Sequence, residues 1–112
     1  MSKTYNKPSL GSLFRQKREE KGLLIRQVAA NTELDQAIIS RIENGDRLPT
    51  KEQVTKLADL YSLDLKEILS AWLAEKMVRD YGNEPYANQA FDVASEYIRF
   101  HIRKKEDEET NT

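Results

Sequence analysis

Four closely spaced side chains, those of Gln36, Ala37, Ser40 and Arg41, have chemistry suited to reading the edges of DNA bases. The Gln36 amide can pair with adenine, the Arg41 guanidinium with guanine, and the Ala37 methyl can pack on the methyl of thymine. Ser40 can bond either a base or a phosphate. These groups act together only if one rigid element presents them on one side, so their spacing matters as much as their types.

A helix over residues 36–44 would present these groups together. At about 100° per residue, residues 36, 37, 40, 41 and 44 fall between roughly 0° and 140° around the axis. Ile38, Ile39 and Ile42 fall between roughly 200° and 300°. The spacing therefore predicts a helix held by isoleucines on one face and polar on the other, as a helix in the major groove requires. Any surface helix has a polar face, so this pattern alone does not identify a DNA-binding protein.

Capping residues and apolar periodicity predict the surrounding helices. Ser9 has the position of an N-cap for a first helix. Thr50 with Gln53, and Asp64 with Glu67, have the spacing of capping boxes for a fourth and a fifth helix. No alternating strand pattern is present. The predicted helices span residues 10–21, 24–30, 36–44, 51–61, 65–81 and 86–102.

Composition excludes several classes of protein. The 112 residues, 38% apolar and 33% charged, suit one small helical domain with an appendage. Without cysteine there is no disulfide framework or thiolate metal site, and neither a glycine-rich phosphate loop nor a metal-ligand spacing is present. His101, the single histidine, lies among basic residues and is expected at the surface. We therefore expect no catalysis, no cofactor and no metal.

Hydropathy gives an expectation for location. No apolar run reaches the roughly 18–20 residues that a membrane span needs, and the polar N-terminus lacks a secretory signal pattern. We expect a cytoplasmic protein that does not enter a membrane.

Charge is distributed unevenly along the chain. Residues 1–63 have 11 Lys/Arg and 8 Asp/Glu, whereas residues 64–112 have 7 and 11. A basic first half can meet phosphates while an acidic second half faces elsewhere. Chance variation in a charged surface explains the difference equally well.

More specific evidence comes from longer runs of sequence. These are Lys-Arg-Glu-Glu-Lys-Gly-Leu at 17–23, Val-Ala at 28–29, Ile-Ser-Arg-Ile-Glu-Asn-Gly-Asp-Arg-Leu-Pro at 39–49, Leu-Ala at 57–58 and Leu-Lys-Glu-Ile-Leu at 65–69. With them, residues 10–69 resemble the helix-turn-helix domain of the phage repressor, Cro and Xre group of transcription regulators. The resemblance implies an all-α fold, namely a five-helix lambda-repressor-like helix-turn-helix domain, to which the helices predicted from periodicity after residue 70 add a C-terminal helical extension. It implies nothing about the remaining residues.

The resemblance also implies DNA contacts. Gln36, Ala37 and Arg41 would read bases, with Ser40 beside a base or phosphate. Two positions depart from the family, because Leu24 and Ile25 stand where a polar cap and a glutamine are common. Ile38 likewise replaces a small polar residue, and it either packs inward or meets a thymine methyl. Because Leu24 and Ile25 have no polar side chain, Arg26 and Gln27 are the candidates for contact with the DNA backbone at the second helix. In this family the loop after the third helix also contacts the backbone, which implies Asn44, Arg47 and Lys51.

Members of this group often pair an arginine of the first helix with the glutamate of the Glu-Asn-Gly run. Here the resemblance implies a largely buried ion pair between Arg18 and Glu43, with a structural role. The alternative is that both are solvated surface charges.

The sequence predicts a division of the chain into four segments. We expect a disordered lead at residues 1–8, the helix-turn-helix domain at 9–70, a helical hairpin at 71–103 that turns at Gly82–Pro85, and a disordered charged tail at 104–112. Large apolar residues in the hairpin favour a homodimer, although they could instead cover the first domain, line a ligand pocket or bind a second protein. The predicted dimer or partner surface comprises Trp72, Met77, Tyr81, Phe91 and Tyr97.

These inferences predict a transcription regulator that binds double-stranded DNA in a sequence-specific manner. A repressor that binds a palindromic operator as a dimer fits best. The alternative is an antitoxin, or a controller of a restriction–modification system, whose C-terminal helices bind a protein partner.

Overall fold

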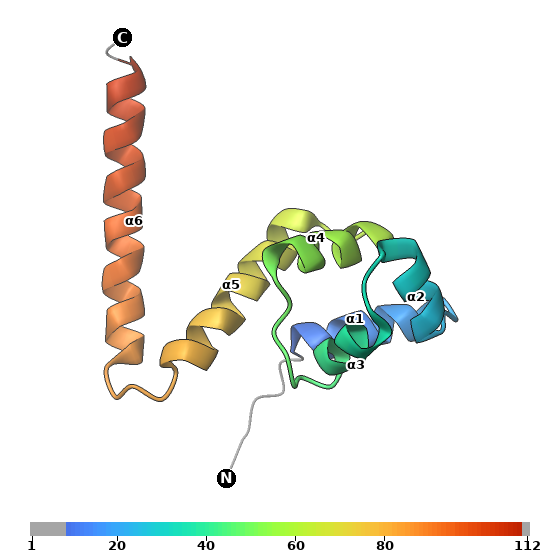
Figure 1. The fold of residues 1–112 in the computed structure, drawn as a ribbon. Helices are drawn as coiled ribbons and strands as arrows, with labels where there is room; N and C mark the ends of the chain where they lie inside the picture. The colour runs from blue at the N-terminus through green and yellow to red at the C-terminus, as the bar shows by residue number, and fades with distance from the viewer. Residues whose placement is uncertain (1–8, 111–112) are drawn as a thin grey trace. The chain divides into compact units, whose positions relative to one another are not determined.

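The computed structural model describes residues 9–110, which form six α-helices and no strand (Figure 1). The all-α class predicted from the sequence is confirmed. The chain divides into two compact units, Met1–Met77 and Val78–Thr112. The disordered lead predicted at residues 1–8 lies outside the described residues, as do residues 111–112 of the tail predicted at 104–112. The helices are α1 (Leu10–Glu20), α2 (Ile25–Thr32), α3 (Gln36–Glu43), α4 (Lys51–Leu60), α5 (Leu65–Tyr81) and α6 (Ala87–Thr110).

Side-chain caps fix where the helices of the first unit begin. Ser9 Oγ accepts from the backbone N–H of residue 12 at 3.2 Å, as the sequence predicts. At α4, Thr50 and Gln53 form the predicted capping box, with bonds of 3.1 and 3.0 Å. At α5, Asp64 accepts from the backbone N–H of Lys66 at 3.0 Å, a single cap in place of the predicted box.

The core of the first unit lies among α1 to α5. Its largest fully buried side chains are Phe14, Val28, Ile39, Ile42, Val54 and Leu57. Each such side chain contributes roughly 1.5–3 kcal/mol through its removal from water. In α4, residues 54, 57, 58 and 61 are all buried, at the spacing of one helix face. This core is the support against which α3 is held.

Gly11 sets how closely α1 and α3 approach each other. Gly11 is buried, and a Cβ added there would overlap the backbone carbonyl oxygen of Ile42 in α3. Only a residue without a side chain fits at this crossing.

Helix α2 is longer than predicted. The sequence indicated a turn starting at Asn31, but the helix continues to Thr32, whose buried hydroxyl donates to Val28 O at 2.7 Å. This bond gives the buried hydroxyl a hydrogen-bond partner within the helix itself. The helix ends at Glu33, which has a left-handed φ of 61°.

The predicted disordered tail is wrong for the residues that the structure describes, because α6 continues through 104–110. Lysine and glutamate have high helix propensity, and they extend an existing helix without a new nucleation step. Lys104 and Glu108, like Lys105 and Glu109, are also four residues apart, a favourable spacing for opposite charges on a helix.

Tyr61 is a buried phenol without a hydrogen-bond partner among residues 9–110. It is 4% exposed and packs against Phe14, with ring centroids 6.1 Å apart. Burial, together with the nearby Glu43 carboxylate, raises the pKa of Tyr61 to about 12 from an ordinary 10.0. The folded state therefore holds this proton more tightly than the unfolded state does.

We expect Tyr61→Phe to leave stability at pH 7 unchanged or raise it by up to about 1 kcal/mol, because it removes an unsatisfied buried hydroxyl. Because the folded pKa is raised, the wild type should lose roughly 2–3 kcal/mol as pH rises from about 10 through 12. Tyr61→Phe should lack that loss. Urea titrations at pH 7, 9 and 11 measure both effects, and equal alkaline slopes in the two proteins would contradict the assignment.

Candidate nucleic-acid interface

Helices α2 and α3 are joined by the short turn Glu33–Asp35. The Asp35 carboxylate accepts from the backbone N–H of Ala37 at 2.7 Å and fixes the start of α3. Ile39 and Ile42 of α3 are buried, and Ile38 is half-buried against the same core. Of the two readings of Ile38 left open by the sequence, the structure has the inward one.

The opposite face of α3 points to solvent. Gln36, Ala37, Arg41 and the C-cap residue Asn44 are exposed, and Ser40 is half-buried. The structure therefore brings the four candidate base-reading residues onto one outward face. The buried isoleucines behind them hold that face in place.

The backbone candidates flank this face on three elements. Arg26 and Gln27 lie in α2, Asn44 and Arg47 in the α3–α4 loop, and Lys51 at the start of α4; all are exposed. Among residues 9–110, none of the cations at positions 26, 41, 47 and 51 takes part in a salt bridge. Their positive charges are therefore available to an anionic partner.

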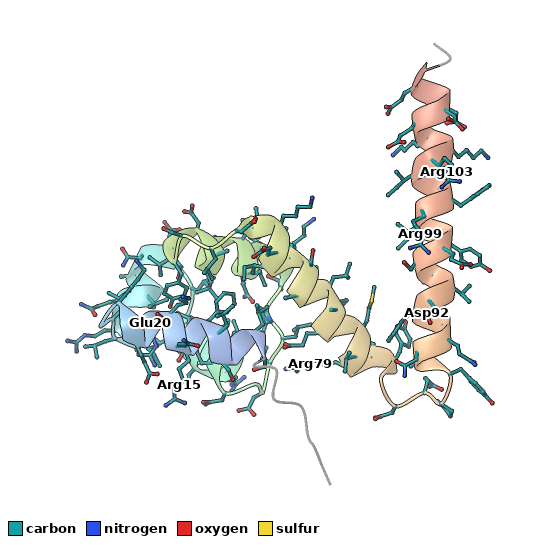
Figure 2. All side chains as sticks on the ribbon, turned by 180° about the vertical axis from the view of Figure 1, so that it is seen from behind. Arg15, Glu20, Arg79, Asp92, Arg99 and Arg103 are labelled. Carbon is teal, nitrogen blue, oxygen red and sulfur yellow. The ribbon has the colours of Figure 1, made fainter. Side chains whose placement is uncertain are left out.

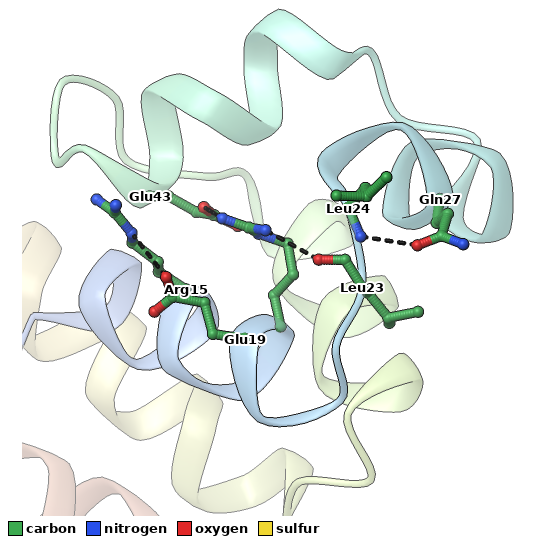
Figure 3. Close-up of polar contacts among 7 residues, drawn as sticks. Arg15, Glu19, Leu23, Leu24, Gln27 and Glu43 are labelled. Carbon is green, nitrogen blue, oxygen red and sulfur yellow. Dashed lines mark hydrogen bonds and ion pairs between the residues drawn. The ribbon is translucent and has the colours of Figure 1, made fainter.

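Gln27 has a structural role that sequence reasoning missed. Its Oε1 accepts from the backbone N–H of Leu24 at 2.8 Å (Figure 3). Leu24 has no polar side chain with which to cap α2, so Gln27 binds this amide from within the helix. With the oxygen engaged, the amide nitrogen of Gln27 is the group that would donate to a phosphate.

The implied ion pair between α1 and the end of α3 is present. Arg18 Nε donates to Glu43 Oε2 at 2.8 Å, and Nη2 donates to Oε1 at 3.0 Å. The side chains are only 13% and 4% exposed, and Arg18 Nη1 donates to Leu23 O at 2.9 Å (Figure 3). The hydrogen bond to Glu43 raises the pKa of Arg18 further above its usual value. This two-pronged bond fixes α3 to α1.

The loop from Asn44 to Thr50 is fixed at both ends. At its start, the backbone N–H groups of Asp46 and Arg47 donate to Arg41 O at 2.9 and 3.3 Å, and Gly45 adopts a φ of 80°. At its end, Pro49 is buried and its carbonyl oxygen accepts from Trp72 Nε1 at 2.7 Å.

This contact corrects one sequence prediction. Trp72 was expected on a dimer surface, but it lies half-buried against the core of the first unit. A partly buried indole needs an acceptor for its N–H, so a contact within the same chain was to be expected. The sequence does not indicate which acceptor it is, and the structure shows that it is the carbonyl oxygen of Pro49, 23 residues earlier.

The other predicted partner-surface residues lie in the remaining part of α5 and in α6. Tyr81 and Tyr97 are 59% and 71% exposed, and Met77 and Phe91 are half-buried. Along α6, side chains project from every side of the helix, with Asp92, Arg99 and Arg103 following one another (Figure 2). At about 100° per residue these three fall within one polar sector.

Comparison with known proteins defines the class. Residues 9–70 match the family described as the helix-turn-helix domain, and the chain belongs to this family of DNA-binding regulators. The resemblance to the Xre-type group is thereby confirmed.

Two particular proteins are similar. The ImmF control region 10 kDa protein of Bacillus phage phi105 is 38% identical over 56 residues, which are 50% of this chain and 62% of that protein. The chain thus matches less than two thirds of that relative's length. A chain of the SinR protein/SinI protein complex has a similar fold, with a TM-score of 0.51 and 20% identity over 84% of this chain and 98% of that chain.

Residues 9–110 hold no group of three or more His, Cys, Asp or Glu side chains arranged for a metal ion. None of their helices has the length and apolarity to cross a membrane.

Proposed function

We propose that this protein is a repressor that binds a palindromic operator as a homodimer, with α3 of each copy in the major groove. The observation that carries the proposal is the exposed face of α3, where Gln36, Ala37 and Arg41 are backed by buried isoleucines. A B-form major groove accepts one helix, and these side chains match adenine, thymine and guanine edges. The similarity to a phage protein named for a control region supports a regulatory role.

Phosphate contacts would set the position of α3 on the duplex. We assign them to the flanking residues Arg26, Gln27, Asn44, Arg47 and Lys51, which are exposed on either side of the α3 face. Such contacts supply affinity and orientation without selecting sequence, whereas the α3 side chains would select it.

The homodimer is proposed from the apolar face of α6. With Ala87 at zero, the apolar residues of the segment 87–103 fall in an arc from roughly 220° through 0° to 60°, in which His101 is the one polar residue of that segment. Many are exposed, including Tyr97 at 71%, Ile98 at 54% and Phe100 at 69%. An arc near 200° is about twice the stripe that a helix normally buries, so this helix has apolar surface for a second copy. The apolar residues are Ala87, Ala90, Phe91, Val93, Ala94, Tyr97, Ile98, Phe100 and Ile102.

Two arginines should separate base reading from phosphate binding. We expect Arg41→Ala to cost about 1–3 kcal/mol on the preferred site and to relax selection at one base pair. Arg47→Ala should weaken binding to every sequence alike and reduce the salt dependence by about one counterion. Titrations of both variants against specific and scrambled duplexes at several salt concentrations measure these effects. An equal loss on all sequences for Arg41→Ala would assign Arg41 to phosphate instead.

The whole proposal is tested by selecting bound duplexes from a random library and measuring the molecular mass by light scattering. We expect inverted half-sites about one helical turn apart and the mass of two chains. Ile98→Glu should give a monomer that binds single half-sites, whereas Arg99→Glu, on the polar side of α6, should leave the dimer intact. Absence of any preferred sequence would refute the proposal. A monomeric wild type would favour the alternative of an antitoxin or controller that uses α6 to bind another protein.

A further inference from the structure

Trp72 holds the loop that follows the reading helix. Its Nε1 donates to Pro49 O at 2.7 Å, a short bond for an indole donor. The Trp72 ring packs against the core of the first unit, and Pro49 is itself buried. A proline has no backbone N–H, so its carbonyl is its only hydrogen-bonding group. The bond to Trp72 therefore provides a partner for a carbonyl removed from water.

The location of this bond gives it a role beyond packing. Pro49 directly precedes Thr50, the N-cap of α4, and ends the loop that carries Arg47. The other end of that loop is held by the bonds from Asp46 and Arg47 to Arg41 O. Between the attached residues Arg47 and Pro49 the loop has only residue 48. The position of the Arg47 Cα is thus determined by α3 on one side and by Trp72 on the other.

We propose that Trp72 is a positioning residue for DNA binding, which acts through the loop that presents Arg47 to the phosphates. This inference rests on the proposed function. Trp72 would not touch DNA; its indole N–H would keep the loop in the conformation that the phosphate contact needs. Loss of the N–H would leave the Pro49 carbonyl without its donor and free the loop end to move. Base reading by α3 would continue, because α3 is held separately by its isoleucines and by Glu43.

The test uses Trp72→Phe in the full chain, which keeps an aromatic ring and removes the donor. We expect affinity to fall about three- to tenfold, the effect of one lost hydrogen bond, on specific and scrambled duplexes alike. The ratio between specific and scrambled affinities should stay unchanged. In the Arg47→Ala background, Trp72→Phe should have almost no further effect, because the contact that it positions is already absent.

Tyr61→Phe is the matched control. It also leaves a phenyl ring in place of an aromatic side chain with a polar group, but Tyr61 has no hydrogen-bond partner within residues 9–110. We expect its DNA affinity to equal that of the wild type. Circular dichroism of each variant, recorded under the conditions of the binding titrations, checks that all remain folded.

Amide hydrogen exchange without DNA gives a second readout. The amides of residues 46–48 should exchange faster in Trp72→Phe than in the wild type, whereas those of the α2–α3 turn should not change. An undiminished effect in the Arg47→Ala background, or unchanged exchange in the loop, would overturn the proposal for Trp72. A wild type that binds no DNA would instead refute the proposed function, and the exchange result would still report whether Trp72 holds the loop.

Discussion

Replacing Arg18 by methionine should lower the free energy of unfolding by about 3–5 kcal/mol, because Glu43 would remain as a buried charge without its partner. Glu43 is only 4% exposed at its side chain, so water cannot replace the two hydrogen bonds that Arg18 donates. Helix α3 should also loosen, since Glu43 is its last residue. Urea titration measures the first effect, and affinity for the selected operator measures the second.

Two controls separate this effect from the general loss of an ion pair. The Arg15–Glu19 pair lies on the same helix, but its atoms are 3.8 Å apart and its side chains are 54% and 60% exposed (Figure 3). Glu19→Gln should therefore cost no more than about 1 kcal/mol. Combining Arg18→Met with Glu43→Leu should recover most of the lost stability, because an apolar pair leaves no buried charge. A double variant as unstable as the single one would contradict this explanation.

Gly11→Ala should also be strongly destabilising, against the usual trend for helices. Within an exposed helix, alanine in place of glycine stabilises by about 1 kcal/mol. At Gly11 the new methyl would overlap the carbonyl oxygen of Ile42 and lie 3.0 Å from its carbonyl carbon. Both are backbone atoms that cannot turn aside, so α1 and α3 must move apart, at a cost of about 1–3 kcal/mol or more. The gain of about 1 kcal/mol offsets part of this cost, so we expect a net loss of up to about 2 kcal/mol.

The same displacement should weaken DNA binding, because α3 carries Arg41. Gln16→Ala, at an exposed position of α1, is the control and should change stability by less than about 0.5 kcal/mol. Thermal unfolding of the two variants beside the wild type distinguishes a helix-propensity effect from a packing effect. If Gly11→Ala stabilised the protein, α1 and α3 would have space for a methyl group at this crossing, and the predicted clash would be wrong.

What the sequence could predict depends on how local each signal is. The two faces of α3 follow from the periodicity of Ile39 and Ile42 against Gln36, a relation within one helix. The Arg18–Glu43 pair spans 25 residues and was available only through resemblance to a family. The bond from Trp72 to Pro49 O could be predicted neither from periodicity nor from the resemblance, because every residue has a backbone carbonyl and the sequence does not show which one accepts.

The C-terminal helices show a different limit. The stop at Gly82–Pro85 was predictable because glycine and proline end helices, and α5 does end at Tyr81. The charged run after Ile102 was misjudged because high charge is typical both of disordered tails and of solvent-exposed helices. Lysine and glutamate have high helix propensity, so a charged run that directly continues a helix extends that helix.

The sequence contains one tryptophan, Trp72, which is hydrogen-bonded to the loop proposed to contact the DNA backbone. Indole emission depends on the polarity around the ring and on the partner of its N–H group. A displacement of Pro49 should therefore change the emission of Trp72. Because Trp72 is the one tryptophan in the sequence, this change would report on the loop alone, and the proposed binding of an operator could be followed on unlabelled protein.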